Sequence, residues 1–117
     1  MNINTVYIYI YIYYMLFKYK YDISIVMGYY NRKPQTINTL NYFEQNYRTY
    51  NYEVIIVDDN STPEHQLDDI IKNYTFPIKY IKITPEEKGN RINPCVTYNK
   101  GFKEAEGERV IIQNPEC

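Results

Sequence analysis

The segment YEVIIVDD, residues 52–59, constrains the fold of this chain more than any other. Its centre, Val54 to Val57, is an uninterrupted run of aliphatic residues rich in β-branching, which is the pattern of a strand buried on both faces. Such strands lie inside parallel sheets that are covered by helices on either side. The run ends in two acidic residues, Asp58 and Asp59. The segment therefore predicts an α/β domain with polar chemistry at the end of a central strand.

From Asp22 onward the hydrophobic pattern alternates between the strand and helix periods. Strands are expected at residues 23–27, 52–59, 78–83 and 109–113. Helices are expected at residues 34–47, 61–74 and 96–105, with a polar loop at 85–94. Pro34 opens the first helix, a capping box of Ser61 and Glu64 opens the second, and Gly107 closes the third. This order predicts a mostly parallel sheet with helices on both faces, ending after its fourth strand.

Residues 1–21 are a separate region, in which VYIYIYIYYMLF alternates Tyr and Ile. A period of two predicts a β-strand with one tyrosine face and one isoleucine face. Tyr and Ile can be written as alternating TAT and ATA codons, so our first interpretation is an extension derived from an AT repeat. An interfacial or aggregation-prone strand ranks second, and a membrane anchor third. The apolar run from Val6 to Phe17 is shorter than the roughly 20 residues of a spanning helix, so no membrane partner is expected.

The composition is that of one modest globular domain. The chain has 117 residues, of which 44% are hydrophobic and 23% charged, and its formal net charge is -1. Because no basic stripe is present, nucleic acid is not an expected partner. The two cysteines, Cys95 and Cys117, lie in no metal-binding pattern with the single His65. We interpret both as free thiols, which favours a cytoplasmic location.

In a parallel sheet, ligands collect at the carboxyl ends of the strands. The segments expected there are residues 28–31, 58–60 and 114–116. The carboxylates of Asp58 and Asp59 could accept hydrogen bonds from the imide N–H of uracil or from ribose hydroxyls. Alternatively, one aspartate caps the following turn through an Asx-type bond, which applies more to Asp58 than to Asp59. The two roles can coexist.

Other polar and aromatic residues are candidates for the rest of such a site. Glu116, with Asn114 beside it, could hold a divalent cation on a diphosphate, because these cations use one or two carboxylates together with phosphate oxygens. Arg91, with Lys88 in the same polar loop, could approach phosphate charge, although both can equally be exposed loop residues. Tyr29 and Tyr30 follow the first strand and could stack on a base.

Three segments together resemble the family 2 glycosyltransferases of the GT-A fold. They are ISIVMGYYNR, EVIIVDDNST and NKGFKEAEGERVIIQNPE, and the resemblance covers about residues 22–117. It implies the donor-binding domain of an enzyme that moves a sugar from a nucleotide, usually a uridine diphosphate, to an acceptor hydroxyl on a glycan, protein or lipid. Asp59 would hold the base with Asp58 beside it, and Gly28 and Tyr30 would line the base and ribose pocket.

The chain departs from the family pattern in two places. Asn114-Pro115-Glu116 stands where the family has an Asp-x-Asp triplet for ribose and a divalent metal, so a Mn²⁺ or Mg²⁺ site would rest on Glu116 with Asn114 on the ribose. The acceptor half and the general base follow the triplet in the family's inverting members, so no catalytic base can be named here. The alternatives are a remnant that only binds nucleotide, or a receiver-like signalling domain, in which the acidic pair would close the first strand instead of the second.

Overall fold

The computed structural model describes residues 2–17, 19–88 and 95–114. Its centre is a four-stranded sheet in the order β3-β2-β1-β4, in which every pair of neighbours is parallel. The strands are β1 (Tyr21–Tyr29), β2 (Tyr52–Asp58), β3 (Ile78–Lys82) and β4 (Gly107–Ile112). All four expected strands are present, so the predicted α/β class with a parallel sheet is confirmed.

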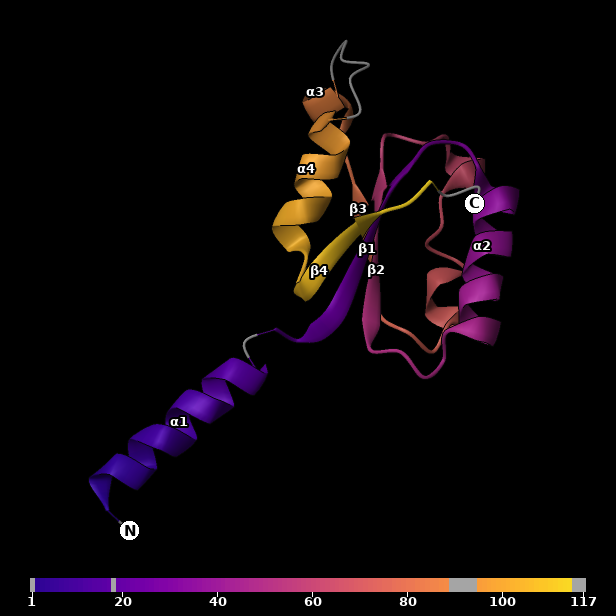
Figure 1. Cartoon of the computed structure of the whole chain (residues 1–117). Helices are drawn as coiled ribbons and strands as arrows, with labels where there is room; N and C mark the ends of the chain where they lie inside the picture. The colour runs from indigo at the N-terminus through magenta and orange to yellow at the C-terminus, as the bar shows by residue number, and fades with distance from the viewer. Residues whose placement is uncertain (1, 18, 89–94, 115–117) are drawn as a thin grey trace.

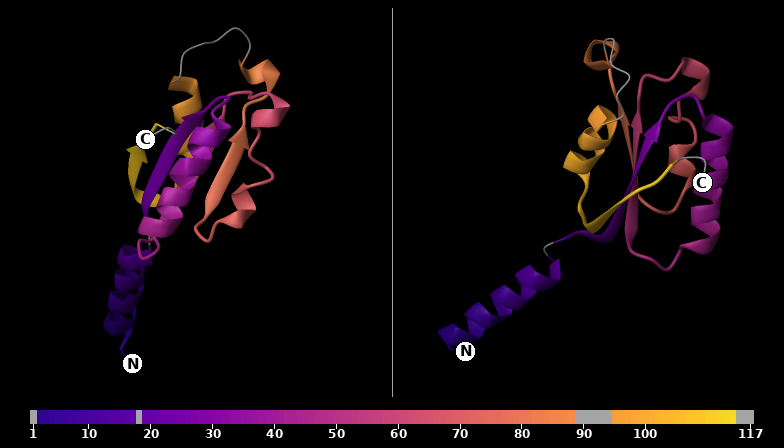
Figure 2. Two further views of the ribbon diagram at one scale, coloured as in Figure 1. Left: turned by 90° about the vertical axis from the view of Figure 1, so that its right-hand side faces the viewer. Right: turned by 45° about the horizontal axis from the view of Figure 1, so that its top comes forward.

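Two α-helices cover opposite faces of the sheet, as Figures 1 and 2 show. Helix α2 (Lys33–Asn46) has Pro34 in its first turn, where the missing N–H costs no hydrogen bond, and buries Leu40 and Phe43. Helix α4 (Cys95–Glu104) lies on the other face. All seven residues of β2 are buried, which agrees with its aliphatic sequence and its place between β1 and β3.

Alternation along the strands divides the core into two clusters. Ile25, Met27, Val54 and Ile56 share the α2 face with the rest of the larger cluster (Tyr29, Leu40, Phe43, Tyr52, Leu67 and Phe76). The smaller cluster, on the α4 face, contains Val26, Ile55, Val57 and Ile83. A Cβ atom added to Gly101 of α4 would lie 2.5 Å from Val26 Cγ1. The bare glycine therefore lets α4 pack closely on the sheet.

The segment 61–74 does not form the α-helix that its pattern predicted. It contains two single 3₁₀ turns, η1 (Pro63–His65) and η2 (Ile71–Asn73). The Ser61 amide donates to Asp58 Oδ1 at 2.8 Å and its hydroxyl accepts from the Asn31 amide at 3.0 Å, so Ser61 does not act as a helix cap. The Leu67 amide donates to the Tyr80 hydroxyl at 3.1 Å. These tertiary bonds take the groups that a helix would use.

The N-terminal region is also different from its prediction, because residues Ile3–Phe17 form helix α1 and not a strand. A strand needs a neighbouring strand to satisfy its backbone groups, whereas a helix satisfies them within its own segment. Helix α1 projects away from the sheet in every view, so it has no such neighbour (Figures 1 and 2). Within the described residues, no helix has the length and apolar character needed to cross a membrane.

Smaller differences concern the stretch before β4. The segment expected to be a loop begins with a single turn of helix, α3 (Pro85–Lys88). Strand β4 starts at Gly107, two residues earlier than residue 109, so this glycine belongs to the strand. A Cβ atom on Gly107 would lie 2.5 Å from the Ser24 backbone nitrogen. The close approach of β4 to β1 therefore requires glycine here.

A buried polar network ties the amino ends of the strands together. Glu53 of β2 is fully buried, and its Oε2 accepts from the Ser24 hydroxyl and from the Glu106 amide, each at 2.6 Å. The Gly107 amide donates to Ser24 Oγ at 2.8 Å, and Lys79 Nζ of β3 lies 3.1 Å from Glu53 Oε1. Residues from or beside all four strands therefore converge on one carboxylate. Sequence analysis did not identify this network.

Strand β4 forms one edge of the sheet and exposes apolar side chains. Val110, Ile111 and Ile112 are 44%, 45% and 57% exposed. Strand β3 forms the other edge, is only five residues long and carries Lys79 and Lys82. The two edges of the sheet thus differ sharply in chemistry.

Candidate donor-binding edge

The predicted site lies where β1 and β2 end, side by side. Tyr29 is the register partner of Asp58, and the Asp59 amide donates to the Tyr29 carbonyl at 2.8 Å, so the parallel ladder continues one residue beyond β2. The Ile83 amide donates to the Asp58 carbonyl at 2.8 Å. The backbone around the acidic pair is therefore fixed from both neighbouring strands.

Asp58 has a structural role. Its side chain is 1% exposed, and its Oδ1 accepts from the Ser61 amide at 2.8 Å while its Oδ2 accepts from the Tyr80 hydroxyl. Burial and the bond to Asp58 raise the pKa of Tyr80. The prediction that an aspartate caps the following turn is thus confirmed for Asp58. Both of its oxygens are occupied by protein donors.

Asp59 is in a different position. It is partly exposed and directly follows the last residue of β2. The next residue, Asn60, has a positive φ of 64° and turns the chain sharply. Of the two aspartates, Asp59 is the one that remains accessible at the edge.

The loops after β1 and β2 are joined by hydrogen bonds from Asn31. Its amide donates to Ser61 Oγ at 3.0 Å, and its Oδ1 accepts from the Thr62 amide at 3.0 Å and from the Thr62 hydroxyl at 3.3 Å. Asn31 has a φ of 50°, a conformation that Asn tolerates better than most residues. Sequence analysis included Asn31 in the strand-end segment without assigning it a role. An asparagine directly after a strand was the available signal.

The residues between Met27 and Asn31 divide into buried and accessible ones. Tyr29 is 1% exposed, its hydroxyl donates to the His65 carbonyl, and burial, with the nearby Asp58 charge, raises its pKa to about 12. Tyr29 is therefore a core residue, and the prediction that it could stack on a base is wrong. Tyr30 is 51% exposed. A Cβ atom on Gly28 would lie 3.4 Å from Thr97 and Tyr98, which puts this glycine beside the first turns of α4.

The predicted phosphate and metal ligands are only partly covered by the structure. Asn114 is exposed, two residues after β4. Arg91 lies outside the described residues, and so does Glu116, the predicted metal ligand. Cys117 also lies outside them. Among the residues that are described, no group of three His, Cys, Asp or Glu side chains could hold a metal ion. The roles predicted for these residues stay predictions.

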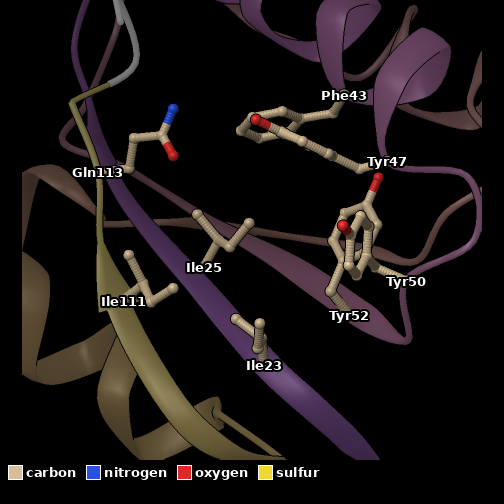
Figure 3. Close-up of a pocket in the computed structure, with 8 residues that line it drawn as sticks. All are labelled: Ile23, Ile25, Phe43, Tyr47, Tyr50, Tyr52, Ile111 and Gln113. Carbon is tan, nitrogen blue, oxygen red and sulfur yellow. The ribbon is translucent and has the colours of Figure 1, made fainter.

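A separate groove lies between α2 and β4, away from the acidic pair. One part has a volume of about 240 Å³ and is lined by Ile23, Ile25, Phe43, Tyr47, Tyr50, Tyr52, Ile111 and Gln113 (Figure 3). An adjoining part of about 530 Å³ shares Phe43, Tyr47 and Gln113 with it. Neither part includes Asp58, Asp59 or Gly28. The lining carries no charged side chain, so the groove is unsuited to a diphosphate.

Two solved structures illustrate the fold that this geometry belongs to. The structure of residues 1–349 of TarS from S. aureus has a TM-score of 0.66 and 24% identity, with 81% of this chain and 27% of that chain covered. The mannosyltransferase PcManGT from Pyrobaculum calidifontis, solved with GDP-Man and Mn²⁺, has a TM-score of 0.64 and 21% identity, with 84% and 28% covered. At these identities they show the fold alone, and the GT-A-type α/β architecture expected from the sequence is confirmed.

Sequence comparison gives the family. A protein from Methanococcus voltae named dolichyl N-acetyl-alpha-D-glucosaminyl phosphate 3-beta-D-2,3-diacetamido-2,3-dideoxy-beta-D-glucuronosyltransferase is 32% identical over 93 residues. The match covers 77% of this chain but only 27% of that relative's length. The family model described as glycosyl transferase family 2 matches residues 24–114, which include both acidic positions at the end of β2. This chain therefore belongs to glycosyl transferase family 2.

Proposed function

We propose that residues 22–117 bind a nucleoside-diphosphate sugar at the edge formed by the ends of β1 and β2. The observation that carries this proposal is the contrast within the acidic pair. Asp58 is buried and bonded to Tyr80 and Ser61, while Asp59 stays partly exposed on a backbone held by the Tyr29 carbonyl. A partly exposed carboxylate on a fixed backbone can accept hydrogen bonds from the imide N–H of a base and from a ribose hydroxyl.

Three features support a nucleotide as the ligand. The Asn31 bridge joins the two strand-end loops, so little ordering is needed when a ligand binds. Tyr30 is exposed beside the acidic pair and presents an aromatic face for a base. Gly28 lies near the end of β1, beside Thr97 and Tyr98 of α4. We assign uracil as the base, because its imide N–H can donate a hydrogen bond to the Asp59 carboxylate.

The diphosphate would be bound by the residues that the sequence predicts as phosphate, ribose and metal ligands. Arg91 would contact phosphate oxygens, Asn114 the ribose, and Glu116 a Mn²⁺ or Mg²⁺ ion. Such an ion would neutralise charge on the leaving diphosphate. The amide oxygen of Asn114 suits this role because it can accept a hydrogen bond from a ribose hydroxyl. The structural neighbour PcManGT, a mannosyltransferase solved with GDP-Man and Mn²⁺, supports a donor and cation of this kind.

The reaction of the whole protein is transfer of the sugar to an acceptor hydroxyl. The name of the Methanococcus voltae relative describes a sugar acceptor carried on dolichyl phosphate. A glycan or lipid-linked sugar is thus the acceptor class that we propose, with a cytoplasmic location where nucleotide sugars are available. A chain that binds donor and does not transfer it is the competing proposal.

Titration calorimetry with a uridine diphosphate sugar and with GDP-mannose, each with and without Mn²⁺, tests donor binding. Asp59→Asn is expected to weaken uridine nucleotide binding about tenfold, because it removes a charged acceptor worth about 1.5 kcal/mol or more. Glu108→Gln is the matched control, since Glu108 is exposed near the amino end of β4, away from the carboxyl ends of β1 and β2. Equal affinity in both variants would refute the role of Asp59.

A sugar-transfer assay then separates the two proposals. Radiolabelled donor is incubated with the protein and a lipid-linked sugar acceptor. Label on the acceptor supports the transferase. Donor binding without acceptor-dependent release of nucleotide supports the binding remnant, and the absence of any donor binding rejects both.

A further inference from the structure

Helix α1 presents an apolar surface that no other part of the described chain covers. Its sequence contains no Asp, Glu, Lys or Arg. The exposed fractions of five side chains in its first half are 72% for Ile3, 67% for Tyr7, 58% for Ile8, 61% for Tyr9 and 59% for Ile10. The helix points away from the sheet and from α2 and α4 (Figures 1 and 2). Because a helix that is apolar on all sides is normally buried in protein or lipid, α1 requires a partner.

We propose that α1 docks this protein on the surface of a lipid bilayer, lying within the headgroup region. A helix of 15 residues is about 22 Å long at 1.5 Å per residue, whereas the hydrocarbon core is about 30 Å thick. The described helix α1 is therefore shorter than the hydrocarbon core is thick. It can instead lie in the plane of the membrane surface, at the boundary between headgroups and hydrocarbon. The sequence alone predicted no membrane partner and ranked an interfacial strand below a repeat-derived extension. The proposal departs from that ranking because the segment is a helix with an uncovered apolar surface.

The tyrosines of α1 favour this boundary over either water or hydrocarbon. A phenol ring is apolar while its hydroxyl seeks a hydrogen-bond partner, and Tyr is enriched at membrane–water interfaces for this reason. Tyr7 and Tyr9 are two positions apart, so they project from nearly opposite sides of the helix. Hydroxyls are thus available on more than one side, with isoleucines between them. A fully dry environment would leave some of these hydroxyls without partners.

The charge pattern next to the helix points to anionic lipid. The first acidic residue of the chain is Asp22, which lies beyond the helix. The side chain of Lys20 is 67% exposed just after α1, and within the described residues it forms a loose ion pair, with Nζ 3.9 Å from Glu106 Oε2. A loose surface pair of this kind contributes little. Lys20 is therefore able to contact lipid phosphate when α1 lies on the surface.

The chain contains no Trp, so one introduced Trp reports its own surroundings without background. Tyr9→Trp on α1 and Tyr42→Trp on α2 make a matched pair, because these tyrosines are 61% and 56% exposed. On vesicles of phosphatidylcholine with phosphatidylglycerol, the fluorescence of Tyr9→Trp is expected to shift to shorter wavelength and to be quenched by brominated lipid. Tyr42→Trp should show neither change. An unshifted Tyr9→Trp, or equal quenching of both, would overturn the proposal.

Vesicle flotation tests the apolar surface directly. Ile8→Asp with Ile10→Asp is expected to lower the bound fraction about tenfold, because carboxylates are costly at the apolar boundary. Asn38→Asp with Gln45→Asp adds the same charge on exposed positions of α2 and should float like the wild type. Sedimentation without lipid tests whether α1 instead binds a second copy of this chain. If α1 forms dimers of this chain and no vesicles bind, membrane docking is rejected. Vesicle binding requires no donor, so this result is independent of the proposed transferase.

Discussion

The two buried carboxylates of β2, Glu53 and Asp58, lie at opposite ends of one strand and illustrate two uses of charge in this domain. Glu53 is enclosed by Ser24, the Glu106 amide and Lys79, with no acidic neighbour left exposed in that strand. Asp58 is enclosed by Ser61 and Tyr80, but Asp59 directly follows it and is partly exposed.

The difference teaches which end can bind a ligand. At the amino end, donors from β1, from β3 and from the residue before β4 converge on the carboxylate, so its charge serves only the fold. At the carboxyl end, Asp58 is taken up by the fold and thereby fixes the backbone that carries Asp59. Asp58 therefore positions the backbone of Asp59, and the two aspartates do not have the same role.

Removing Glu53 should have the largest effect on this comparison. Glu53→Ala leaves the Ser24 hydroxyl and the Glu106 amide without their acceptor and removes one of the two carboxylates that pair with Lys79, at a cost of about 3 kcal/mol in the free energy of unfolding. Urea denaturation followed by circular dichroism measures it. Glu108→Ala, an exposed acidic residue of β4, should change stability by less than about 0.5 kcal/mol. Similar values for the two would show that the network contributes little.

Two glycines allow a matched test of the same two ends. Gly107→Ala would bring a Cβ atom within 2.5 Å of the Ser24 backbone nitrogen, which cannot move aside, so we expect a loss of about 2 kcal/mol. Gly28→Ala meets Thr97 and Tyr98 at 3.4 Å, an ordinary contact distance, and should cost less than about 1 kcal/mol. Thermal and urea unfolding of both variants compares them. A larger loss of unfolding free energy for Gly28→Ala than for Gly107→Ala would contradict the closer packing at the amino ends of the strands.

The support given by Asp58 should be smaller but specific. Asp58→Ala is expected to lower stability by about 1.5 kcal/mol, because the Ser61 amide and the Tyr80 hydroxyl lose their acceptor. A double-mutant cycle with Tyr80→Phe should show coupling of about 1 kcal/mol between the two side chains. Asp59→Asn is the paired variant and should keep the urea midpoint within experimental error. No coupling between Asp58 and Tyr80 would contradict the structure.

The smallest effect appears only in alkali. In the folded protein the pKa of Tyr29 is raised to about 12, from the ordinary value of 10.0 that applies to the unfolded chain. As the pH rises, the unfolded chain therefore loses this proton first. The stabilising contribution is therefore complete below about pH 10 and is lost as the pH rises toward about 12. Tyr29→Phe should flatten the fall in unfolding free energy across this window. The stability of wild type and variant is measured by urea titration at several pH values, and parallel curves would exclude Tyr29.

Lys79 adds to the same alkaline window from the other end of the sheet. Burial lowers its pKa, but the neighbouring carboxylates of Glu53 and Glu106 outweigh this, and the folded pKa is raised above its usual value. Its contribution is likewise present below the unfolded pKa and lost as the pH passes the folded one. The slope that remains in Tyr29→Phe therefore includes the response of the Glu53 network.

The sheet was predictable because each strand carries its own signal. Val54 to Val57 could only be a doubly buried strand, and the apolar spacing after Pro34 gives α2. The segment 61–74 was not predictable, because its apolar spacing is helical while its outcome depends on distant partners. Asn31 and Tyr80 bind Ser61 and Leu67 from other parts of the chain, and no local pattern contains that information.

The candidate site was predictable at the level of segments and less so at the level of side chains. Strand-end topology brings residues 28–31 and 58–60 together. Tyr29 and Asp58 are the last residues of β1 and β2 and are buried, whereas Tyr30 and Asp59 follow the strand ends and are more exposed. The sequence does not fix the residue at which each strand ends. Likewise, Glu53 was not predicted as a network centre, although a charged residue inside a buried strand implies partners.

The unequal edges of the sheet have a consequence for how the purified chain would associate. Strand β4 offers Val110, Ile111 and Ile112 along an open edge, whereas β3 is short and carries lysines. Edges of the first kind invite strand addition and those of the second kind resist it. Each molecule then has one sheet edge available for strand pairing. Association through this edge therefore stops at a dimer and does not continue into a fibre.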